Sequence, residues 1–451
     1  MIVQSRQLAC GTRSAWLTLC GLACLWPATC STRVLGGERN QPSKSATAIS
    51  ERTPLPLTAS DWPWWRGHTR DGIAAKGQRP PTAWSASKNV LWKAPLSGRG
   101  HASATVVGQR VFLPTADEKR EVQTIICLDR KTGRPLWSQA VHQGDLEKRG
   151  HRRSSQASST IACDGERLYT NFLHGGAIHT TALSLDGQPL WQQKICDFET
   201  HQGFASSPAI YASLLIVSAD NRGGGLVTAL DRKTGKPVWS HRRPKLPNYT
   251  SPTILRAAGR DQVLLSGCNL VSSYDPLSGK KLWETEGATT ECVTTMVTDG
   301  QRVFTSGGYP QNHMQALNAD GSGQVAWQNN TRVYVPSMLV HQNHLYCITD
   351  AGIAMCWNSA TGKQLWKHRL GGTFNASSVL VNNQIYATNE AGTTFIFEAN
   401  PQEFQLVAQN TIGDEVFASP VICGDCLYLR TARLADGGRQ EFLYCIAQPR
   451  R

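Results

Sequence analysis

Short apolar runs alternate with polar turns from about residue 85 onward, and they follow one repeated order. In the stretch Ser103 to Phe112, a hydroxyl residue leads into an apolar run, a turn at Gly108-Gln109 follows, and a second apolar run begins. A third run ends in Leu-Asp, the chain turns at Thr-Gly, and a fourth short run carries a tryptophan. Alternating and β-branched residues between turn signals predict strands, so each unit should form a four-stranded antiparallel sheet.

The tryptophan of the fourth run recurs seven times, at intervals of 39 to 54 residues. The seven are Trp92, Trp137, Trp191, Trp239, Trp283, Trp327 and Trp366. A period of about 40 to 50 residues built from short strands is typical of a β-propeller, in which each repeat forms one blade. We expect these tryptophans to be structural, as large apolar plates between neighbouring blades.

The hydroxyl residue before the first run gives a second, independent count. It recurs at Ser103, Ser158, Ser207, Ser251, Thr294, Ser337, Ser377 and Ser419, which makes eight repeats. In the seventh repeat Val407 replaces the tryptophan, and the last repeat ends without a fourth run. The isolated run at Val90–Lys93 can supply that missing strand. The sequence therefore predicts an all-β, eight-bladed propeller whose ring is closed by an N-terminal strand, and because closure removes exposed edges we expect a monomer.

The turn before each tryptophan also has a structural explanation. In the phrase Asp129 to Gly133, the aspartate can accept hydrogen bonds from backbone N–H groups and from the Thr132 hydroxyl. Gly133 allows a positive φ at low steric cost. We therefore interpret these recurring aspartates as parts of the turn and not as catalytic carboxylates.

The N-terminal part of the chain has a different composition. Arg6 and Arg13 precede an apolar run from Ala15 to Trp26 and a stretch of small residues, which is typical of a secretory signal. The predicted divisions are a signal peptide at 1–30, a disordered tether at 31–60, a Trp-rich segment at 61–84 that packs on the propeller, and the propeller at 85–451. We expect export to the periplasm or cell envelope, and cleavage before Cys30 with lipidation is the alternative to ordinary export.

Ten of the fourteen cysteines lie outside this leader, and their pairing is open. Cys127, Cys356 and Cys445 occupy positions that are small residues in other repeats, so we interpret them as small buried apolar residues. Cys423 and Cys426 form a CxxC phrase where other repeats place a hairpin turn. The phrase predicts a cross-hairpin thiol pair or disulfide, and the alternative is a functional redox motif.

The formal net charge of +13 favours anionic partners. Basic residues gather at 148–153 and 241–245, which suggests an acidic polysaccharide or an anionic lipid surface as a ligand. Ordinary solvated loop charges are the simpler interpretation. No nucleic-acid partner is expected, because no motif that reads RNA or DNA accompanies the basic runs.

The repeated phrase Asp-x-x-Thr-Gly-x-x-x-Trp resembles the pyrroloquinoline-quinone (PQQ)-type repeat. That family includes eight-bladed quinoprotein dehydrogenases and BamB, a scaffold lipoprotein of outer-membrane protein assembly. The opening Trp62 to Gly72 is similar to the start of exported PQQ-like propellers of planctomycete-type bacteria. The resemblance covers residues 61 to about 447 and implies the propeller fold, while its members serve as enzymes and as scaffolds.

Resemblance to the dehydrogenases implies PQQ, a calcium held by Glu, Asn and Asp oxygens, an aspartate base and a vicinal Cys-Cys disulfide. This chain has no adjacent cysteine pair and no position that matches the metal or base motifs. Hydrolase, metalloprotease and Walker phrases do not occur either. Histidines at 101, 174, 179 and 201 could meet in space, but their spacing does not predict a metal site. We therefore expect no catalytic residues, metal or cofactor, with PQQ and calcium as the alternative.

A ligand site is expected where the residues before the innermost strands converge, at one mouth of the central channel. The candidate ring is His101, Arg153, His201, Tyr249, Glu291, Arg332, Tyr334, Asn375 and Glu415. An ordinary solvated rim is the alternative. The resulting hypothesis is a non-catalytic cell-envelope scaffold, similar to BamB, that binds envelope proteins or peptides. A quinoprotein oxidoreductase or an acidic-polysaccharide binder remains the alternative.

Overall fold

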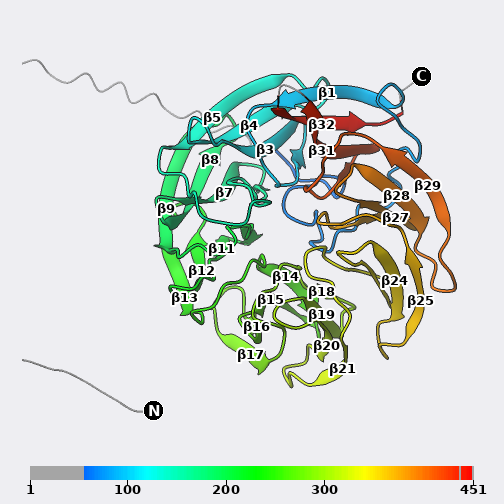
Figure 1. Cartoon of the computed structure of the whole chain (residues 1–451). Coiled ribbons are helices and arrows are strands. Elements are labelled where there is room, and N and C mark those ends of the chain that lie inside the picture. Colours follow the sequence, from blue (N-terminus) through cyan, green and yellow to red (C-terminus); the bar gives the residue numbers. More distant parts are fainter. Residues whose placement is uncertain (1–54, 436–437, 449–451) are drawn as a thin grey trace, which may run out of the picture. The chain divides into compact units, whose positions relative to one another are not determined.

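The computed structural model describes residues 55–435 and 438–448, which form eight four-stranded antiparallel sheets arranged around a channel (Figure 1). This confirms the predicted all-β, eight-bladed propeller. The predicted signal peptide, Cys30 and most of the predicted tether lie outside the described residues. Within the described part of the chain, no helix has the length and apolar character needed to span a membrane.

Each blade runs outward from a short inner strand at the channel. Blades 1 to 4 are β2 (Thr105–Val107), β3 (Arg110–Asp117), β4 (Val122–Asp129), β5 (Pro135–Gln143); β6 (Ala162–Cys163), β7 (Arg167–His174), β8 (Ala177–Ser184), β9 (Pro189–Asp197); β10 (Ala209–Tyr211), β11 (Leu214–Ser218), β12 (Leu226–Asp231), β13 (Pro237–Arg242); β14 (Thr253–Ala257), β15 (Arg260–Gly267), β16 (Leu270–Tyr274), β17 (Lys281–Glu286). Blades 5 to 7 are β18 (Val297–Thr298), β19 (Arg302–Gly307), β20 (His313–Asn318), β21 (Val325–Asn329); β22 (Leu339–His341), β23 (His344–Ile348), β24 (Ile353–Asn358), β25 (Gln364–Arg369); β26 (Val379–Val381), β27 (Gln384–Thr388), β28 (Thr393–Glu398), β29 (Leu406–Thr411).

Blade 8 combines strands from both ends of the propeller. Its order is β1 (Val90–Leu96), β32 (Gly438–Ile446), β31 (Cys426–Ala435) and β30 (Val421–Cys423). Trp92 of β1 pairs with Cys445 of β32 in antiparallel register. The ring is therefore closed by the N-terminal strand, as the strand count predicted.

The tryptophans join each blade to the next one. Six indole Nε1–H groups donate to backbone carbonyls in the turn of the following blade. The pairs are Trp92 with Arg130, Trp137 with Leu185, Trp191 with Arg232, Trp239 with Pro276, Trp327 with Ser359 and Trp366 with Asn400. Trp283 differs, because its Nε1–H donates to Gln262 of its own blade. Six of the seven tryptophans thus link neighbouring blades by a hydrogen bond.

The glycine of the turn phrase lies directly under the indole ring of the preceding blade. Gly235 has a φ of +74°, and a Cβ added there would lie 2.6 Å from Trp191. Gly133 under Trp92 and Gly279 under Trp239 show the same close approach. In the same turns the aspartate accepts the expected hydrogen bonds. Asp129 Oδ1 accepts one from the Thr132 backbone N–H over 2.8 Å and one from the Thr132 hydroxyl over 2.6 Å. The Thr132 hydroxyl is the main reason why the pKa of Asp129 falls below its ordinary value.

The hydroxyl column forms hydrogen bonds around the channel. Backbone N–H groups of one blade donate to the hydroxyl of the next, from Ser103 to Thr160, Thr160 to Ser207, Ser207 to Ser251, Thr295 to Ser337, Ser337 to Ser377 and Ser377 to Ser419. Six of the predicted positions take part. In blades 2 and 5 the participating residues are Thr160 and Thr295 instead of the predicted Ser158 and Thr294, because the two threonines 160 and 295 lie two residues before the inner strand, as in the other blades; Thr295 takes part through its backbone N–H.

Residues 55–84 cross one face of the ring and contact blades that are far apart in the sequence. Leu55 bonds Gly165, Trp62 pairs with Val106, and Ala74 bonds Leu380. Between these points the buried Arg66 guanidinium donates to the carbonyls of Ser378 and Met338. Their blue trace is visible at the centre of the ring in Figure 1. Because this segment lies across the channel, it leaves the opposite mouth open.

All ten cysteines of the described residues are free thiols. Cys423 and Cys426 are paired in register across the two-residue hairpin, so they form a thiol pair and not a disulfide. Cys127 and Cys356 are completely buried and Cys445 nearly so, as expected for small apolar positions.

Candidate functional site

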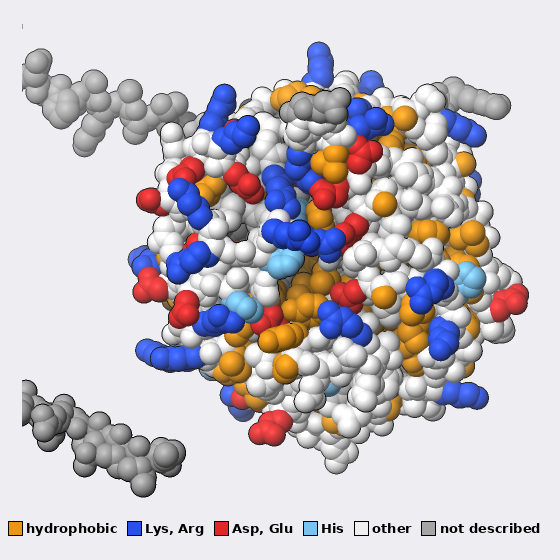
Figure 2. All heavy atoms as spheres, viewed as in Figure 1, with side chains coloured by type: hydrophobic (Ala, Val, Ile, Leu, Met, Phe, Trp, Pro, Cys, Tyr) orange, Lys and Arg blue, Asp and Glu red, His pale blue; other side chains and the backbone are white. Residues whose placement is uncertain are grey.

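A cavity of about 550 Å³ opens at the uncovered mouth of the channel. Its lining combines polar residues with five aromatic or aliphatic ones, Trp65, Phe204, Val293, Phe374 and Phe417. Figure 2 shows apolar side chains inside the central hollow, with charged side chains around it. An apolar interior with a few convergent polar groups is the usual character of a ligand site.

Six of the nine predicted rim residues line this cavity. They are His101, Arg153, Tyr249, Arg332, Tyr334 and Asn375. His201 and Glu291 do not line it but are hydrogen-bonded to residues that do. Glu415 is in a different environment, where it forms a β-bridge with Ala432 and an ion pair with Arg439. The structure therefore places eight of the nine in the lining of this cavity or in direct contact with it.

A continuous chain of polar contacts runs along one side of the mouth. The Tyr334 hydroxyl donates to Glu291 Oε2 over 3.0 Å, and Glu291 Oε1 lies 3.2 Å from His201 Nδ1. The same nitrogen is 3.1 Å from the Tyr249 hydroxyl. Burial, followed by the negative charge of Glu291, raises the pKa of both tyrosines, so they remain neutral hydrogen-bonding groups. These hydrogen bonds hold the Tyr334 side chain in place next to Arg332.

Arg332 is exposed at the rim and only lightly constrained. Its Nη1 donates to the Gly308 carbonyl over 2.6 Å, and its guanidinium lies 5.1 Å from the centre of the Tyr334 ring. In the part of the chain that the structure describes, no Asp or Glu forms an ion pair with it. The nearby Asp350 carboxylate instead accepts the backbone N–H groups of Tyr334 and Val335, over 2.7 and 3.1 Å.

Arg153, unlike Arg332, forms an ion pair. Its guanidinium forms an ion pair with Glu390 over 2.8 Å, across 237 positions of sequence, and Asn375 donates to the same carboxylate. Arg153 therefore already has a carboxylate partner, although it lines the same cavity.

His101 adds a neutral aromatic group to the wall. Its ring stacks on Phe417 with centroids 4.3 Å apart, and its buried Nε2 has no hydrogen-bond partner among the described residues. Burial, together with Arg99, Arg430 and Arg439, lowers the pKa of His101 well below its ordinary value. The imidazole is therefore uncharged at neutral pH.

The sequence analysis missed Trp65, Asp350, Glu390 and Phe417. A signal for two of them exists, because Asp350-Ala-Gly and Glu390-Ala-Gly occur at the same point of consecutive repeats, before strands β24 and β28. Because these two acidic residues occupy corresponding turns between strands, they lie at the same mouth of the channel. Trp65 belongs to the segment that crosses the ring, so the repeat pattern gives no position for it.

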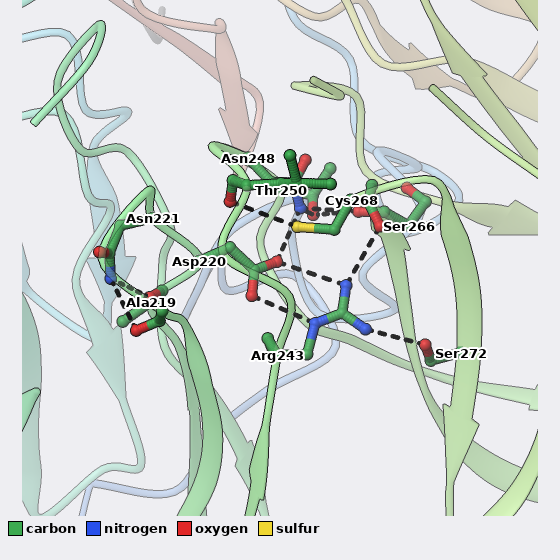
Figure 3. A network of polar contacts seen from close by, with 12 residues as sticks. Ala219, Asp220, Asn221, Arg243, Asn248, Thr250, Ser266, Cys268 and Ser272 are labelled. Atoms are coloured by element: carbon green, nitrogen blue, oxygen red, sulfur yellow. Dashed lines mark hydrogen bonds and ion pairs between the residues drawn. The ribbon is translucent and has the colours of Figure 1, made fainter. Parts of the chain in front are cut away.

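Within the basic run 241–245, Arg243 is buried, whereas Arg242 and Lys245 are exposed. Arg243 and Asp220 are an ion pair with only 1% of each side chain exposed, and their facing groups are shown in Figure 3. Asn248 adds a 3.0 Å bond to Asp220, while Arg243 also donates to Ser272 and to the Gly267 carbonyl. Although burial disfavours its charged form, the Asp220 carboxylate keeps the pKa of Arg243 above its ordinary value. This network joins blades 3 and 4, so Arg243 is not available to a polysaccharide.

Three histidines gather near the ends of β5, β7 and β8. His142 lies 4.3 Å from His174 and 5.4 Å from His179, measured between ring centroids. Of the four histidines considered from the sequence, only His174 and His179 come together. Among the described residues no three His, Cys, Asp or Glu side chains are arranged to hold a metal ion.

This cluster makes stability sensitive to acid. Burial, and then His174 and His179, lower the pKa of His142 to about 3, against an ordinary value of 6.5. Between those values the unfolded chain binds a proton that the folded chain does not, so stability should fall as the pH decreases from about 6.5 toward 3. We expect His142→Gln to have a flatter dependence of the urea midpoint on pH in this range, compared with His344→Gln as control. Equal slopes for the two variants would contradict the assignment.

The mouth does not fit PQQ with a calcium ion. The carboxylates near it already have partners: Glu291 accepts from Tyr334, Asp350 from two backbone N–H groups, and Glu390 pairs with Arg153. They sit on different blades, and the described residues contain no group of three His, Cys, Asp or Glu side chains that could hold a metal ion. The vicinal disulfide that the dehydrogenase resemblance implies also has no counterpart, because the chain contains no adjacent cysteine pair.

Comparison with known proteins places this architecture in a family. The family model described as "Outer membrane protein assembly factor BamB" matches residues 72–203, 186–368 and 310–411. The outer membrane protein assembly factor BamB of Xanthomonas campestris pv. campestris is 32% identical over 147 residues, which is 32% of this chain. The match spans only 31% of that relative's length.

Solved structures show the same fold at low identity. BamB from Moraxella catarrhalis superposes with a TM-score of 0.55 and 14% identity, covering 78% of this chain and 96% of that one. A europium-containing methanol dehydrogenase gives 0.62 and 10% identity, covering 86% and 98%. A BamB protein and a methanol dehydrogenase thus share this architecture, and the likeness extends to the fold alone.

Proposed function

Because the chain belongs to the family described as outer membrane protein assembly factor BamB, we propose that it is a non-catalytic cell-envelope propeller that binds other envelope proteins. The observation that carries this proposal is the open cavity at the channel mouth, with an aromatic interior and a rim built from several blades. Such a surface suits a segment of a partner protein, because apolar side chains can enter while the rim offers hydrogen bonds.

The proposal includes an envelope location and partners of the outer-membrane assembly type, as the names of the relatives suggest. The division into a signal peptide at 1–30, a tether at 31–60, a Trp-rich segment at 61–84 and a propeller from 85 is part of it. An acidic glycan is a weaker candidate, since Arg243 is buried and Lys148 and Arg149 pair with Glu121 and Glu147.

Site-specific photocrosslinking tests the scaffold role. A benzoylphenylalanine placed at Gln202, which lines the cavity, should capture an envelope protein in extract of the cells that make this protein. The same group at the exposed Lys131, in the outer turn of blade 1, should capture none. Equal adducts at the two positions, or none at Gln202 across several salt concentrations, would contradict docking at the mouth.

The oxidoreductase alternative is tested on the same protein. Incubation with PQQ and Ca²⁺ should leave the melting temperature unchanged, and a redox dye with alcohols or sugars should not be reduced. This expectation follows from the carboxylates that are already paired and do not converge at the mouth. Saturable stabilisation together with turnover would replace the scaffold proposal by an enzyme with an unusual site.

A further inference from the structure

The two arginines at the channel mouth differ in one respect that points to a ligand. Arg153 is neutralised by Glu390 over 2.8 Å, whereas Arg332 contacts a backbone carbonyl and the face of Tyr334. A guanidinium has five N–H donors, and Arg332 uses one of them in a hydrogen bond that the structure records. It therefore presents unused donors at the rim of the cavity, with no direct ion-pair partner among the described residues.

The residues around Arg332 leave space for its side chain at the rim. A Cβ added at Gly308 would lie 2.9 Å from Arg332 Nη1 and 2.6 Å from Tyr334 Cβ, so the glycine leaves room for both side chains. Tyr334 is in turn held by its 3.0 Å bond to Glu291. Asp350 forms no direct ion pair with Arg332: its two oxygens accept backbone N–H groups, and its charge acts on the guanidinium without direct contact.

The floor of the cavity offers an apolar surface to a ligand that binds Arg332. Trp65 forms part of it, with its Nε1–H already satisfied by Thr295 over 2.7 Å. Phe417 is covered on one side by the neutral His101 ring. The apolar floor therefore offers area for burial, while the fork of Arg332 matches the two oxygens of a carboxylate.

We propose that the channel mouth binds an extended peptide segment by a carboxylate held on Arg332 and a neighbouring apolar side chain placed over Trp65. The carboxylate belongs either to an Asp or Glu side chain or to the chain terminus. This inference rests on the proposed function, because that function makes a protein segment the occupant. A cavity of about 550 Å³ holds a few residues of such a segment, which is within the usual size range of ligand sites.

Selection from a random peptide library displayed on phage tests the carboxylate. Wild-type protein should enrich peptides that carry an acidic residue or a free terminus beside an aromatic or aliphatic residue. The Arg332→Gln variant should lose this enrichment, while Arg134→Gln, which removes a charge from an outer turn of blade 1, should retain it. Enrichment without acidic groups, or the same enrichment on Arg332→Gln, would overturn the proposal.

Fluorescence anisotropy with the best selected peptide distinguishes the two sources of the carboxylate. Replacing the acid by its amide, or amidating the terminus, should weaken binding about 10- to 100-fold in only one of the two cases. Arg332→Lys should restore part of the affinity lost in Arg332→Gln, because it keeps the charge but not the two-pronged geometry. If neither amide weakens binding, no carboxylate is recognised.

The two tests can fail separately. Capture at Gln202 without selection of acidic peptides would leave the scaffold function in place and remove the role of Arg332. Selection of acidic peptides without capture from extract would support carboxylate binding by Arg332 and contradict the scaffold function.

Discussion

The Asp220→Asn variant is expected to lower the free energy of unfolding by about 3–5 kcal/mol. The substitution keeps the shape of the side chain but leaves the Arg243 guanidinium buried without a counter-charge. Both side chains are only 1% exposed, so solvent cannot replace the lost partner. Urea denaturation followed by tryptophan fluorescence should show a large fall in midpoint, because the network of Figure 3 joins blades 3 and 4.

Two comparisons separate this effect from the general cost of losing an ion pair. Asp197→Asn breaks a pair with Lys194 on the exposed edge of blade 2 and should leave the midpoint unchanged. The double variant Asp220→Leu with Arg243→Met should recover much of the loss, since it removes both buried charges. If Asp220→Asn is as mild as Asp197→Asn, the pair does not hold these blades together.

Gly235→Ala should reduce stability by about 2–4 kcal/mol, through two costs at one position. The residue has a φ of +74°, which alanine adopts with strain, and the added methyl group would lie 2.6 Å from Trp191. The indole cannot move away easily, because its Nε1–H is bonded to the Arg232 carbonyl over 3.1 Å. The same urea titration measures the loss.

Gly259→Ala is the matched control, because its φ is +78° and no atom lies within 4 Å of the new methyl group. It should cost about 1–2 kcal/mol, the part due to the backbone alone. The difference between the two variants measures the contact between blades 2 and 3. Similar losses in both would mean that the tryptophan adapts to the methyl group.

The repeated residues allowed most of the fold to be predicted. Trp191 is one of seven recurring tryptophans and Ser207 is one of eight recurring hydroxyl residues, because most blades contact their neighbours in the same way. The exceptions are local: Trp283 turns to Gln262, and Thr160 replaces the predicted Ser158 in the hydrogen bonds around the channel. Neither changes the number of blades.

The site was harder to predict, because its residues occur once. The order of the blades places Tyr249, Arg332 and Tyr334 at one mouth, but the pairing between Arg153 and Glu390 joins blades 2 and 7. Nothing in the sequence near either residue specifies the other. Which arginine is neutralised, and which is free to bind a ligand, depends on side-chain directions that the repeat does not encode.

The closure of the ring has a consequence for how the protein is made. β1 ends at Leu96 and its partner β32 begins at Gly438, so the first strand of the described residues can pair only after the last of them has been synthesised. A truncated chain keeps an unpaired strand edge, which is a template for aggregation or a target for chaperones and proteases. Closure of blade 8 therefore requires a chain that extends from β1 through β32.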